Sequence, residues 1–345
     1  MELIDHLGIN IEKDTEVNSL VIWIKGILCL LMLFTYILFY QVVAIICTLA
    51  STVFPDSANL FRNNCTNMFW DLSLYLMHLN KVKFRIFGDQ MVSDPAIIVS
   101  NHASLADCFV LHYLSRISVL GENYVPMQYQ DQFSLPIINF FSWFLVWRVP
   151  TVKILLHMLK CDENWELEPK SLSFVFSRLI RSKFSEWIVL FPEVNIWSEN
   201  SASLQQQVSD KYYLPKFEHL LYPRYSAFFN VISALDEWKP HPYLNLYDIT
   251  IVYYRHSENG GVKCYDPPTL LDVFSCINPI TVMVYVKIRS VSRIPEKRKK
   301  LEKYVEHLWK HKDKVITQLK TENSTNQHSQ RKLRIQDNLS EITFN

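Results

Sequence analysis

Residues 100–111 read Ser-Asn-His-Ala-Ser-Leu-Ala-Asp-Cys-Phe-Val-Leu, and they place His102 five residues before Asp107. The apolar run just upstream, residues 96–99, follows a proline and is typical of a buried strand. Downstream we expect a helix whose start is marked by Ser104 and Asp107, because a Ser-x-x-Asp pair before an apolar run is a capping signature. The stretch therefore predicts a strand, a turn and a helix in direct succession.

The spacing of His102 and Asp107 favours a catalytic pair at this junction. In a continuous helix, side chains five positions apart would point about 140° away from each other. His102 must therefore precede the helix, where the chain could bend its ring back toward Asp107 and leave one ring nitrogen free as a base. The alternative is that Asn101 and Ser104 cap the helix, Asp107 complements the helix dipole, and His102 merely occupies a turn.

Length and composition limit the class of protein. The 345 residues suffice for one large α/β domain or two small ones, and we expect one domain with appendages. A formal net charge of +1 gives no field that favours nucleic acid as a partner, whereas 49% hydrophobic residues indicate a non-aqueous one. The seven cysteines are widely spaced without a Cys-x-x-Cys pair, which predicts reduced thiols, no metal site and a reducing compartment.

The N-terminal part of the chain predicts a membrane anchor. Residues 26–55 contain no charged side chain, and this run exceeds the roughly 20 residues that cross a bilayer core. A single span and a hairpin that enters and leaves one leaflet both fit. Residues 61–79 are expected to form an amphipathic helix on the membrane or beneath the first helix, or alternatively a core helix. The expected organisation is a polar tail (1–19), the anchor with its amphipathic helix (20–80), a globular domain (81–320) and a disordered tail (321–345).

The remaining elements follow from hydrophobic periodicity and turn residues. Further strands are expected over residues 82–87, 187–191, 246–254 and 281–288. Helices are expected over residues 173–183 and 295–319, whereas 161–171 is expected as a loop and the Ser/Gln-rich residues 198–210 as a mobile segment. The helix at 295–319 is basic, so its charged face is either solvated or rests on anionic lipid.

The His102 to Asp107 spacing, followed about ninety residues later by Phe191-Pro192-Glu193, resembles the glycerolipid acyltransferases of the 1-acylglycerol-3-phosphate type. The order of the other family blocks agrees, since Arg148 stands where the second block ends and Tyr222-Pro223-Arg224 falls at the fourth. Residues 187–193, 220–224 and 247–251 look most like the lysocardiolipin and lysophosphatidylglycerol acyltransferase branch. The resemblance implies an α/β fold with a mixed sheet flanked by helices.

The resemblance also implies an activity. A fatty acyl group would pass from acyl-CoA, the co-substrate, to the free hydroxyl of a lysophospholipid at the bilayer, with His102 as general base and Asp107 orienting it. No metal and no other cofactor are implied. The expected location is the endoplasmic reticulum membrane, with the catalytic domain in the cytosol. The aromatic residues 140–147 would line the acyl path, and the acceptor would be bound by Arg148, Glu193, Asn195 and Arg224.

The third block departs from the family pattern. Val194-Asn195-Ile196 follows Glu193, where the family usually continues with Gly-Thr-Arg or a related run. Valine adopts a positive φ only at a cost, so we expect the turn to be reshaped. Ile196 supplies no cation, so phosphate binding would come from Arg148, Arg224 or backbone amides, or be absent. Two alternatives therefore stay open: a CoA-independent transacylase like the tafazzin relatives, and a non-catalytic membrane protein on the same fold.

Overall fold

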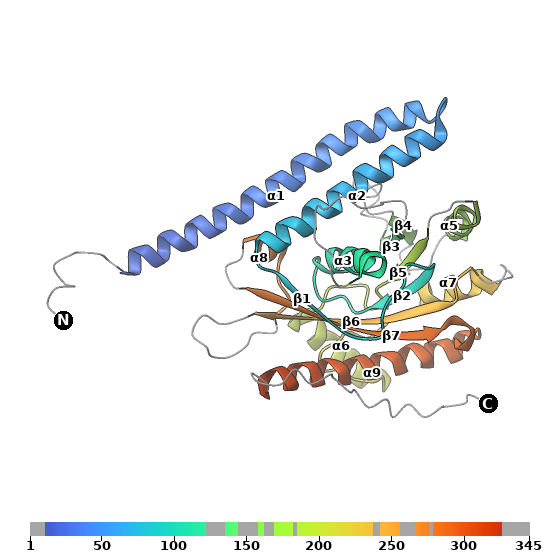
Figure 1. Ribbon diagram of the computed structural model, residues 1–345. Coiled ribbons are helices and arrows are strands. Elements are labelled where there is room, and N and C mark those ends of the chain that lie inside the picture. Colours follow the sequence, from blue (N-terminus) through green and yellow to red (C-terminus); the bar gives the residue numbers. More distant parts are fainter. Residues whose placement is uncertain are drawn as a thin grey trace, which may run out of the picture.

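The centre of the molecule is a seven-stranded mixed sheet with strand order β1-β7-β6-β2-β5-β3-β4 (Figure 1). The structure is a computed structural model that describes residues 11–121, 135–143, 158–161, 169–181, 185–236, 242–255, 266–275 and 279–325. The strands are β1 (Lys83–Gly88), β2 (Ala96–Ser100), β3 (Ile137–Trp143), β4 (Met158–Cys161), β5 (Glu186–Leu190), β6 (Asn245–Arg255) and β7 (Ile280–Ser290). Neighbouring strands are parallel except β6 and β7, which are antiparallel.

Helices cover both faces of this sheet (Figure 1). Those described are α1 (Ile11–Ala50), α2 (Pro55–Leu79), α3 (Asp107–Leu120), α5 (Pro169–Arg181), α6 (Glu199–Tyr212), α7 (Ser226–Asp236), α8 (Leu270–Ser275) and α9 (Arg298–Thr325), with a 3-10 turn at Val291–Arg293. The hairpin of α1 and α2 lies with α3 and α8 on one side, and α6 and α9 lie on the other (Figure 1). The confirmed fold class is thus α/β, a mixed sheet flanked by helices.

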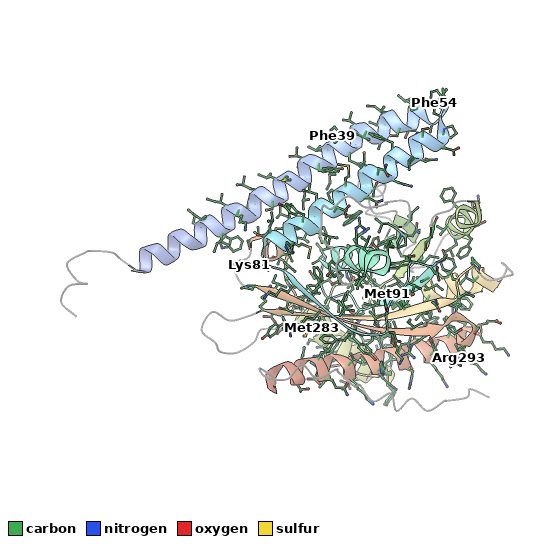
Figure 2. The ribbon with its side chains drawn as sticks, viewed as in Figure 1. Phe39, Phe54, Lys81, Met91, Met283 and Arg293 are labelled. Carbon is green, nitrogen blue, oxygen red and sulfur yellow. The ribbon has the colours of Figure 1, made fainter. Side chains whose placement is uncertain are left out.

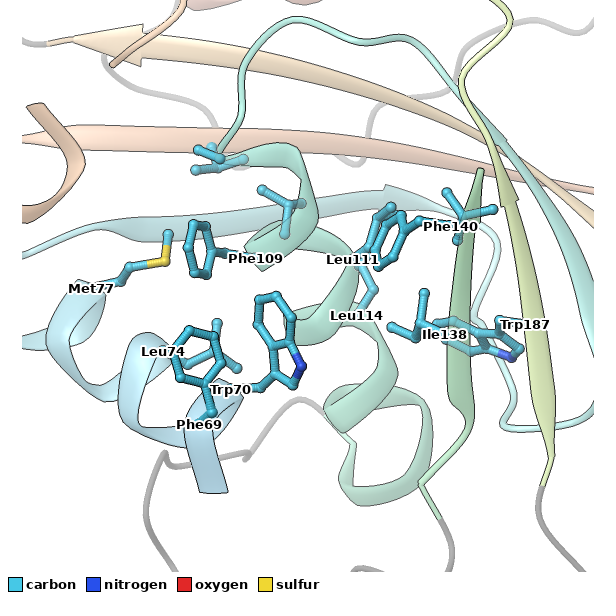
Figure 3. Close-up of a cluster of buried hydrophobic side chains, with 14 of the residues drawn as sticks. Phe69, Trp70, Leu74, Met77, Phe109, Leu111, Leu114, Ile138, Phe140 and Trp187 are labelled. Atoms are coloured by element: carbon cyan, nitrogen blue, oxygen red, sulfur yellow. The ribbon is translucent and has the colours of Figure 1, made fainter. Parts of the chain in front are cut away.

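The central strands explain why the sheet is buried on both faces. Every residue of β2 and β5 is buried, as the continuous apolar runs of a parallel sheet require. Alternate residues of β2 enter different cores: Ala96 and Ile98 pack toward the hairpin, whereas Ile97 and Val99 pack toward α9. Figure 3 shows the first core, where Trp70 of α2 and Phe109 of α3 meet above the strands. Packed side chains therefore support the central strands, and with them the junction that follows β2, from both faces of the sheet.

The N-terminal helices form an antiparallel hairpin. Tyr36 of α1 donates to the Cys65 carbonyl of α2 at 2.8 Å, and the Tyr40 and Thr66 hydroxyls are hydrogen-bonded at 2.8 Å. Within α1, Leu20–Ala50 is long and apolar enough to cross a membrane, with a mean hydropathy of 2.3 and only 22% of its most apolar window buried. The second helix packs beneath the first and contributes Phe69, Trp70 and Leu74 to the core, so it combines two of the three arrangements expected for it. Exposed side chains project from the hairpin, such as Phe39 along α1 and Phe54 at the turn between the helices (Figure 2).

Several boundaries differ from those expected. Helix α1 starts at Ile11, inside the expected polar tail, and α9 runs to Thr325, beyond the expected end of the globular domain. Residues 198–210, expected to be mobile, form α6 instead, because the Ser198 hydroxyl caps its first turn by accepting from the Ser201 amide. Its exposed, polar sequence has no apolar periodicity that could have indicated a helix.

Two strands were not expected at all. Strand β3 lies in the aromatic stretch that was assigned to an acyl path, and β4 ends at Cys161, where a loop was expected. A short apolar run does not by itself distinguish strand from helix, and β3 is defined by its pairing with β5, which is distant in the sequence.

Candidate active site

Asn101 directly follows strand β2, at the point where the chain leaves the sheet. Its side-chain Nδ2 donates to the Ile251 carbonyl at 2.9 Å, and its Oδ1 accepts from the Ile251 amide at 2.8 Å. The buried amide thus continues the pairing of β2 with β6 by one more step, and His102 is the first residue beyond it. Asn101 is therefore a clamp on β6 and not the helix cap that the simpler interpretation required.

His102 and Asp107 are in contact, as their spacing predicts. His102 Nδ1 lies 3.0 Å from Asp107 Oδ2, and the same oxygen accepts from the amides of Ala103 at 2.8 Å and Ser104 at 3.0 Å. The other oxygen accepts from the Tyr253 hydroxyl at 2.7 Å. The Asp107 side chain is fully buried, so these donors replace the water that its charge would otherwise need. With Nδ1 turned to the carboxylate, Nε2 of His102 is the nitrogen available as a base.

Tyr253 is a member of this cluster that the sequence analysis missed. Burial, and next the negative charge of Asp107, raise the pKa of its hydroxyl well above the ordinary value, so it remains a neutral hydrogen-bond donor. The signal was present in the alternation of β6, where Tyr247, Ile249, Ile251 and Tyr253 all face the hairpin side of the sheet. The sequence does not indicate that Asp107, at the start of α3, lies next to Tyr253.

The helix after the junction starts at Asp107, three residues later than Ser104, where it was expected. The Ser104 hydroxyl accepts from the Ala106 amide at 3.1 Å and donates to the Pro268 carbonyl at 2.6 Å. The Asp107 carboxylate nevertheless accepts from the Ser104 amide, which is the acidic half of a capping box. The carboxylate therefore both stabilises the turn and orients the histidine, so the two interpretations of Asp107 are not exclusive.

The third block brings an aromatic ring and a carboxyl group to the same junction. Residue Val99 of β2 pairs with Leu190 of β5, so parallel pairing places the residues after both strands at one edge of the sheet. The Phe191 ring stacks on the His102 ring with centroids 4.4 Å apart, and Phe140 stacks on Phe191 at 6.3 Å. Of the aromatic stretch assigned to the acyl path, Phe140 is buried, and residues 144–147 lie outside the described part.

Glu193 is 2% exposed, and its two oxygens contact different parts of the chain. Oε2 accepts from the His102 amide at 3.4 Å, and Oε1 accepts from Trp309 Nε1 at 3.2 Å. Burial raises the pKa of this carboxyl group from 4.5 to about 8, although both hydrogen bonds act in the opposite direction. Glu193 therefore belongs to the interior of the site.

Val194 corrects one expectation directly. Its φ is +69°, so the valine itself adopts the left-handed conformation that it was expected to avoid. Such a conformation costs on the order of 1–3 kcal/mol for a residue with a Cβ branch. Neighbouring hydrogen bonds hold it: the Val194 amide donates to the Phe191 carbonyl at 2.9 Å, and the Trp197 amide donates to the His102 carbonyl at 3.0 Å.

Comparison with known proteins agrees with this geometry. Residues 83–254 match the family model described as Acyltransferase, and residues 272–344 match the one described as Acyltransferase C-terminus. The chain belongs to the glycerolipid acyltransferase family. The Arabidopsis thaliana proteins named probable 1-acyl-sn-glycerol-3-phosphate acyltransferase 5 and 1-acyl-sn-glycerol-3-phosphate acyltransferase 3 are both 22% identical to it, over 88% and 75% of this chain and 75% and 65% of their own lengths.

Two further relatives of this acyltransferase are more distant. Lysocardiolipin acyltransferase 1 of Danio rerio is 21% identical over 68% of this chain and 55% of its own length. The crystal structure of the 1-acyl-sn-glycerophosphate acyltransferase PlsC from Thermotoga maritima has a TM-score of 0.42 and 12% identity, covering 83% of this chain and 95% of that one.

The acceptor-binding residues expected in this acyltransferase are not all brought together. Arg148 lies outside the described residues. The side chains of Asn195 and Arg224 are exposed, and the Arg224 amide donates to the Pro192 carbonyl at 2.7 Å, so the fourth block adjoins the third. Among the described residues there is no group of three or more His, Cys, Asp or Glu side chains that could hold a metal ion.

Proposed function

We propose that this acyltransferase moves a fatty acyl group from acyl-CoA to the free hydroxyl of a lysophospholipid at a membrane surface. The observation that carries the proposal is the His102–Asp107 contact at the carboxyl edge of the sheet, with Asp107 buried among four hydrogen-bond donors. The printed names of the relatives support a glycerolipid acceptor. Tyr253 and the two amides hold the Asp107 carboxylate, and the carboxylate in turn fixes the Nδ1 edge of the imidazole, which is what a general base needs.

The proposed reaction needs no covalent enzyme intermediate. Nε2 of His102 removes the proton of the acceptor hydroxyl, and the oxygen attacks the thioester carbonyl carbon of acyl-CoA. The imidazolium that forms is stabilised by the Asp107 carboxylate 3.0 Å from Nδ1. When the tetrahedral intermediate collapses, the C–S bond breaks and the CoA sulfur takes the proton back from Nε2. The products are the diacyl lipid and free CoA, and the histidine returns to its neutral form.

For the membrane anchor, we infer a hairpin embedded in one leaflet. Near its start α1 packs directly on α8, since a Cβ added at Gly26 would lie 2.7 Å from the Ser275 Cβ. Further along, Tyr40 bonds Thr66 of α2, and α2 in turn packs on α3. A helix that crossed the whole bilayer would have to leave these partners. Insertion of the outer face of α1 into one leaflet keeps every contact and still covers its exposed apolar side chains.

The location and orientation of the enzyme are also part of the proposal. Lys81, Lys83 and Arg85 follow the hairpin, and basic residues next to a membrane segment favour the cytosolic side. We therefore propose an endoplasmic reticulum membrane with the active site in the cytosol. Protease protection of sealed microsomes tests this orientation, because a cytosolic globular domain is digested without detergent and a lumenal one is not.

Acyl transfer is tested with membranes from cells that express the protein, given radiolabelled acyl-CoA and a panel of lysolipids. Incorporation that disappears in His102→Ala supports the proposal. Incorporation that appears only when a diacyl phospholipid donor replaces acyl-CoA supports the transacylase alternative. The non-catalytic alternative rested on Val194 and Ile196, and the retained turn at Val194 removes part of its basis. Equal background in the wild type and in His102→Ala with every donor and acceptor would favour that alternative.

A further inference from the structure

Helix α9 lies on the face of the sheet opposite the hairpin (Figure 1). Two of its buried side chains reach the active-site junction. Trp309 Nε1 donates to Glu193 Oε1 at 3.2 Å. Lys312, one turn further, donates to the carbonyls of Val99 at 3.1 Å and Ile249 at 2.6 Å. Val99 precedes His102 by three residues, so α9 touches the chain just before the histidine as well as the block beside it.

Lys312, the buried cation of α9, has an anionic partner other than Glu193. Lys312 forms an ion pair with Asp248, and Arg289 donates to the same carboxylate at 3.0 Å. Burial works to raise the pKa of Asp248, but Lys312 and Arg289 outweigh it and hold the pKa below its ordinary value. The cation on α9 therefore has its own partner. The charge of Lys312 also acts to lower the pKa of Glu193, but Trp309 is the residue of α9 that donates a hydrogen bond to this carboxyl group.

The Glu193 carboxyl group bridges Trp309 and the backbone of His102. One oxygen accepts from the indole, and the other accepts from the His102 amide at 3.4 Å. The carbonyl of His102 is held as well, because it accepts from the Trp197 amide at 3.0 Å. The amide and the carbonyl of His102 are thus both hydrogen-bonded to the segment from Glu193 to Trp197. Helix α9 contacts that segment through the bond from Trp309 to Glu193.

We propose that Trp309 is a positioning residue, and that it fixes the backbone of His102 through Glu193. Glu193 then acts inside the protein and does not contact the lipid acceptor. The proposal rests on the proposed acyl transfer only where its effect is measured as a change in kcat. The placement of His102 can also be measured by the chemical reactivity of its ring, which does not depend on turnover.

The chemistry of glutamine offers a sharp test. Both oxygens of a carboxyl group have lone pairs that can accept from N–H donors, the hydroxyl oxygen of the protonated form included, whereas the nitrogen of a glutamine amide can only donate. Glu193→Gln therefore sets its NH₂ group against either the Trp309 indole or the His102 amide. Trp309→Phe removes the first donor and lets the glutamine oxygen face the His102 amide. The double variant should consequently recover part of what Glu193→Gln loses.

A matched control is available in the same core. Trp187 is fully buried and its Nε1 donates to the Asp94 carbonyl at 3.0 Å, away from Glu193. Trp187→Phe removes the same kind of bond from the same kind of site. If Trp309 acts only by packing, the two phenylalanine variants should behave alike.

The experiment uses the full chain in membranes, with acyl-CoA and the acceptor that gives the highest turnover. We expect kcat to fall roughly ten-fold in Trp309→Phe and roughly a hundred-fold in Glu193→Gln, because small displacements of a reacting group are costly. The double variant should resemble Trp309→Phe, and Trp187→Phe should stay within about two-fold of the wild type. A raised KM for the lysophospholipid with unchanged kcat in Glu193→Gln, or losses that multiply in the double variant, would overturn the proposal.

The second readout is the rate at which diethyl pyrocarbonate modifies His102, followed by mass spectrometry of its peptide. The His102 side chain is 15% exposed, so a loosened backbone should raise this rate several-fold in Trp309→Phe and Glu193→Gln but not in Trp187→Phe. Buried His112 reports general unfolding and should stay unmodified. Unchanged His102 reactivity in both variants would reject the positioning role. A wild type inactive toward all lysolipids, with the reactivity pattern intact, would reject the proposed function alone.

Discussion

The two longest of the described helices, α1 and α9, lie on opposite sides of one sheet (Figure 1). Their outward faces differ in polarity. Both bury a stripe of side chains: α1 contributes Tyr40 and Val43 to one core, and α9 contributes Leu308 and Trp309 to the other. On the outward face α1 is apolar, whereas the exposed side chains of α9 include lysines. Both helices pack in the same way but their outer faces differ, which is the difference expected if α1 inserts into lipid, as proposed above, and α9 faces water.

The position of α9 also bears on whether its basic face is solvated or rests on anionic lipid. A membrane that covers the hairpin cannot at the same time touch the outer face of α9 on the other side of the sheet (Figure 1). The arrangement therefore favours a solvated charged face over a foot on anionic lipid. The active-site junction lies between the two helices: the hairpin side supplies Asp107 and Tyr253, and the α9 side supports Glu193.

The largest effect is expected at this junction. His102→Ala and Asp107→Asn should each lower acyl transfer by roughly 10³-fold or more, because the first removes the base and the second removes the charge that stabilises the imidazolium. Membrane association should not change, since neither residue lies on the outer face of α1. Activity is measured with radiolabelled acyl-CoA, and association by flotation of membranes. Near-normal turnover in either variant would refute the assigned pair.

The comparison of the two outer faces is tested by charge substitution. Leu31→Lys, Leu38→Lys and Ile45→Lys together place three cations on the exposed side of α1, where each side chain is about half exposed and little packing is lost. We expect the membrane-bound fraction to fall roughly ten-fold or more, because each lysine in the apolar part of a bilayer costs on the order of 1–3 kcal/mol.

The matched change on the other face is Lys299→Glu with Lys303→Glu, at two exposed positions of α9. Flotation with vesicles of neutral and of anionic phospholipid should show no loss of binding. If binding to anionic vesicles alone decreases, α9 contacts lipid, and the inference that its outer face is solvated is wrong.

The local part of the site was predictable, and the supporting part was not. The contact of His102 with Asp107 spans five residues, and the helical repeat alone required the histidine to precede the helix. The contact of Trp309 with Glu193 spans 116 residues and that of Tyr253 with Asp107 spans 146. Both depend on which strands are neighbours in the sheet, and periodicity carries no information on strand order. The same holds for β3, whose apolar sequence fits several elements until its partner is known.

The pH dependence of stability gives a smaller effect. Burial raises the pKa of the Glu193 carboxyl group from 4.5 to about 8, so the folded protein keeps this proton over a range in which the unfolded chain has released it. A proton held by the folded state alone favours folding less and less as pH rises. Glu193 should therefore lower the free energy of unfolding progressively between about pH 4.5 and pH 8, by on the order of a few kcal/mol.

This prediction is checked by urea unfolding of the detergent-solubilised protein between pH 5 and 8. Glu193→Gln has no proton to lose, so its curve of stability against pH should be flatter than that of the wild type. The W187F variant keeps the glutamate and should retain the wild-type slope. Parallel curves for the wild type and Glu193→Gln would show that the carboxyl group is not held neutral.

The smallest effect is expected at Val194, in the loop that joins the two sides of the site. Its φ of +69° is costly for a β-branched residue and cheap for glycine, although glycine also gains freedom in the unfolded chain. These opposing terms leave a net stabilisation of about 1 kcal/mol for Val194→Gly, which for a chain of 345 residues raises Tm by about 1–2 °C. Val194→Ala is the matched control: it keeps a Cβ, removes the branch, and should gain less than glycine. Acyl transfer should stay near the wild-type rate in both, because the hydrogen bonds of the turn that hold the His102 carbonyl come from the backbone. If Val194→Gly instead lowers the Tm, the side chain of this half-buried valine contributes more by packing than its backbone conformation costs.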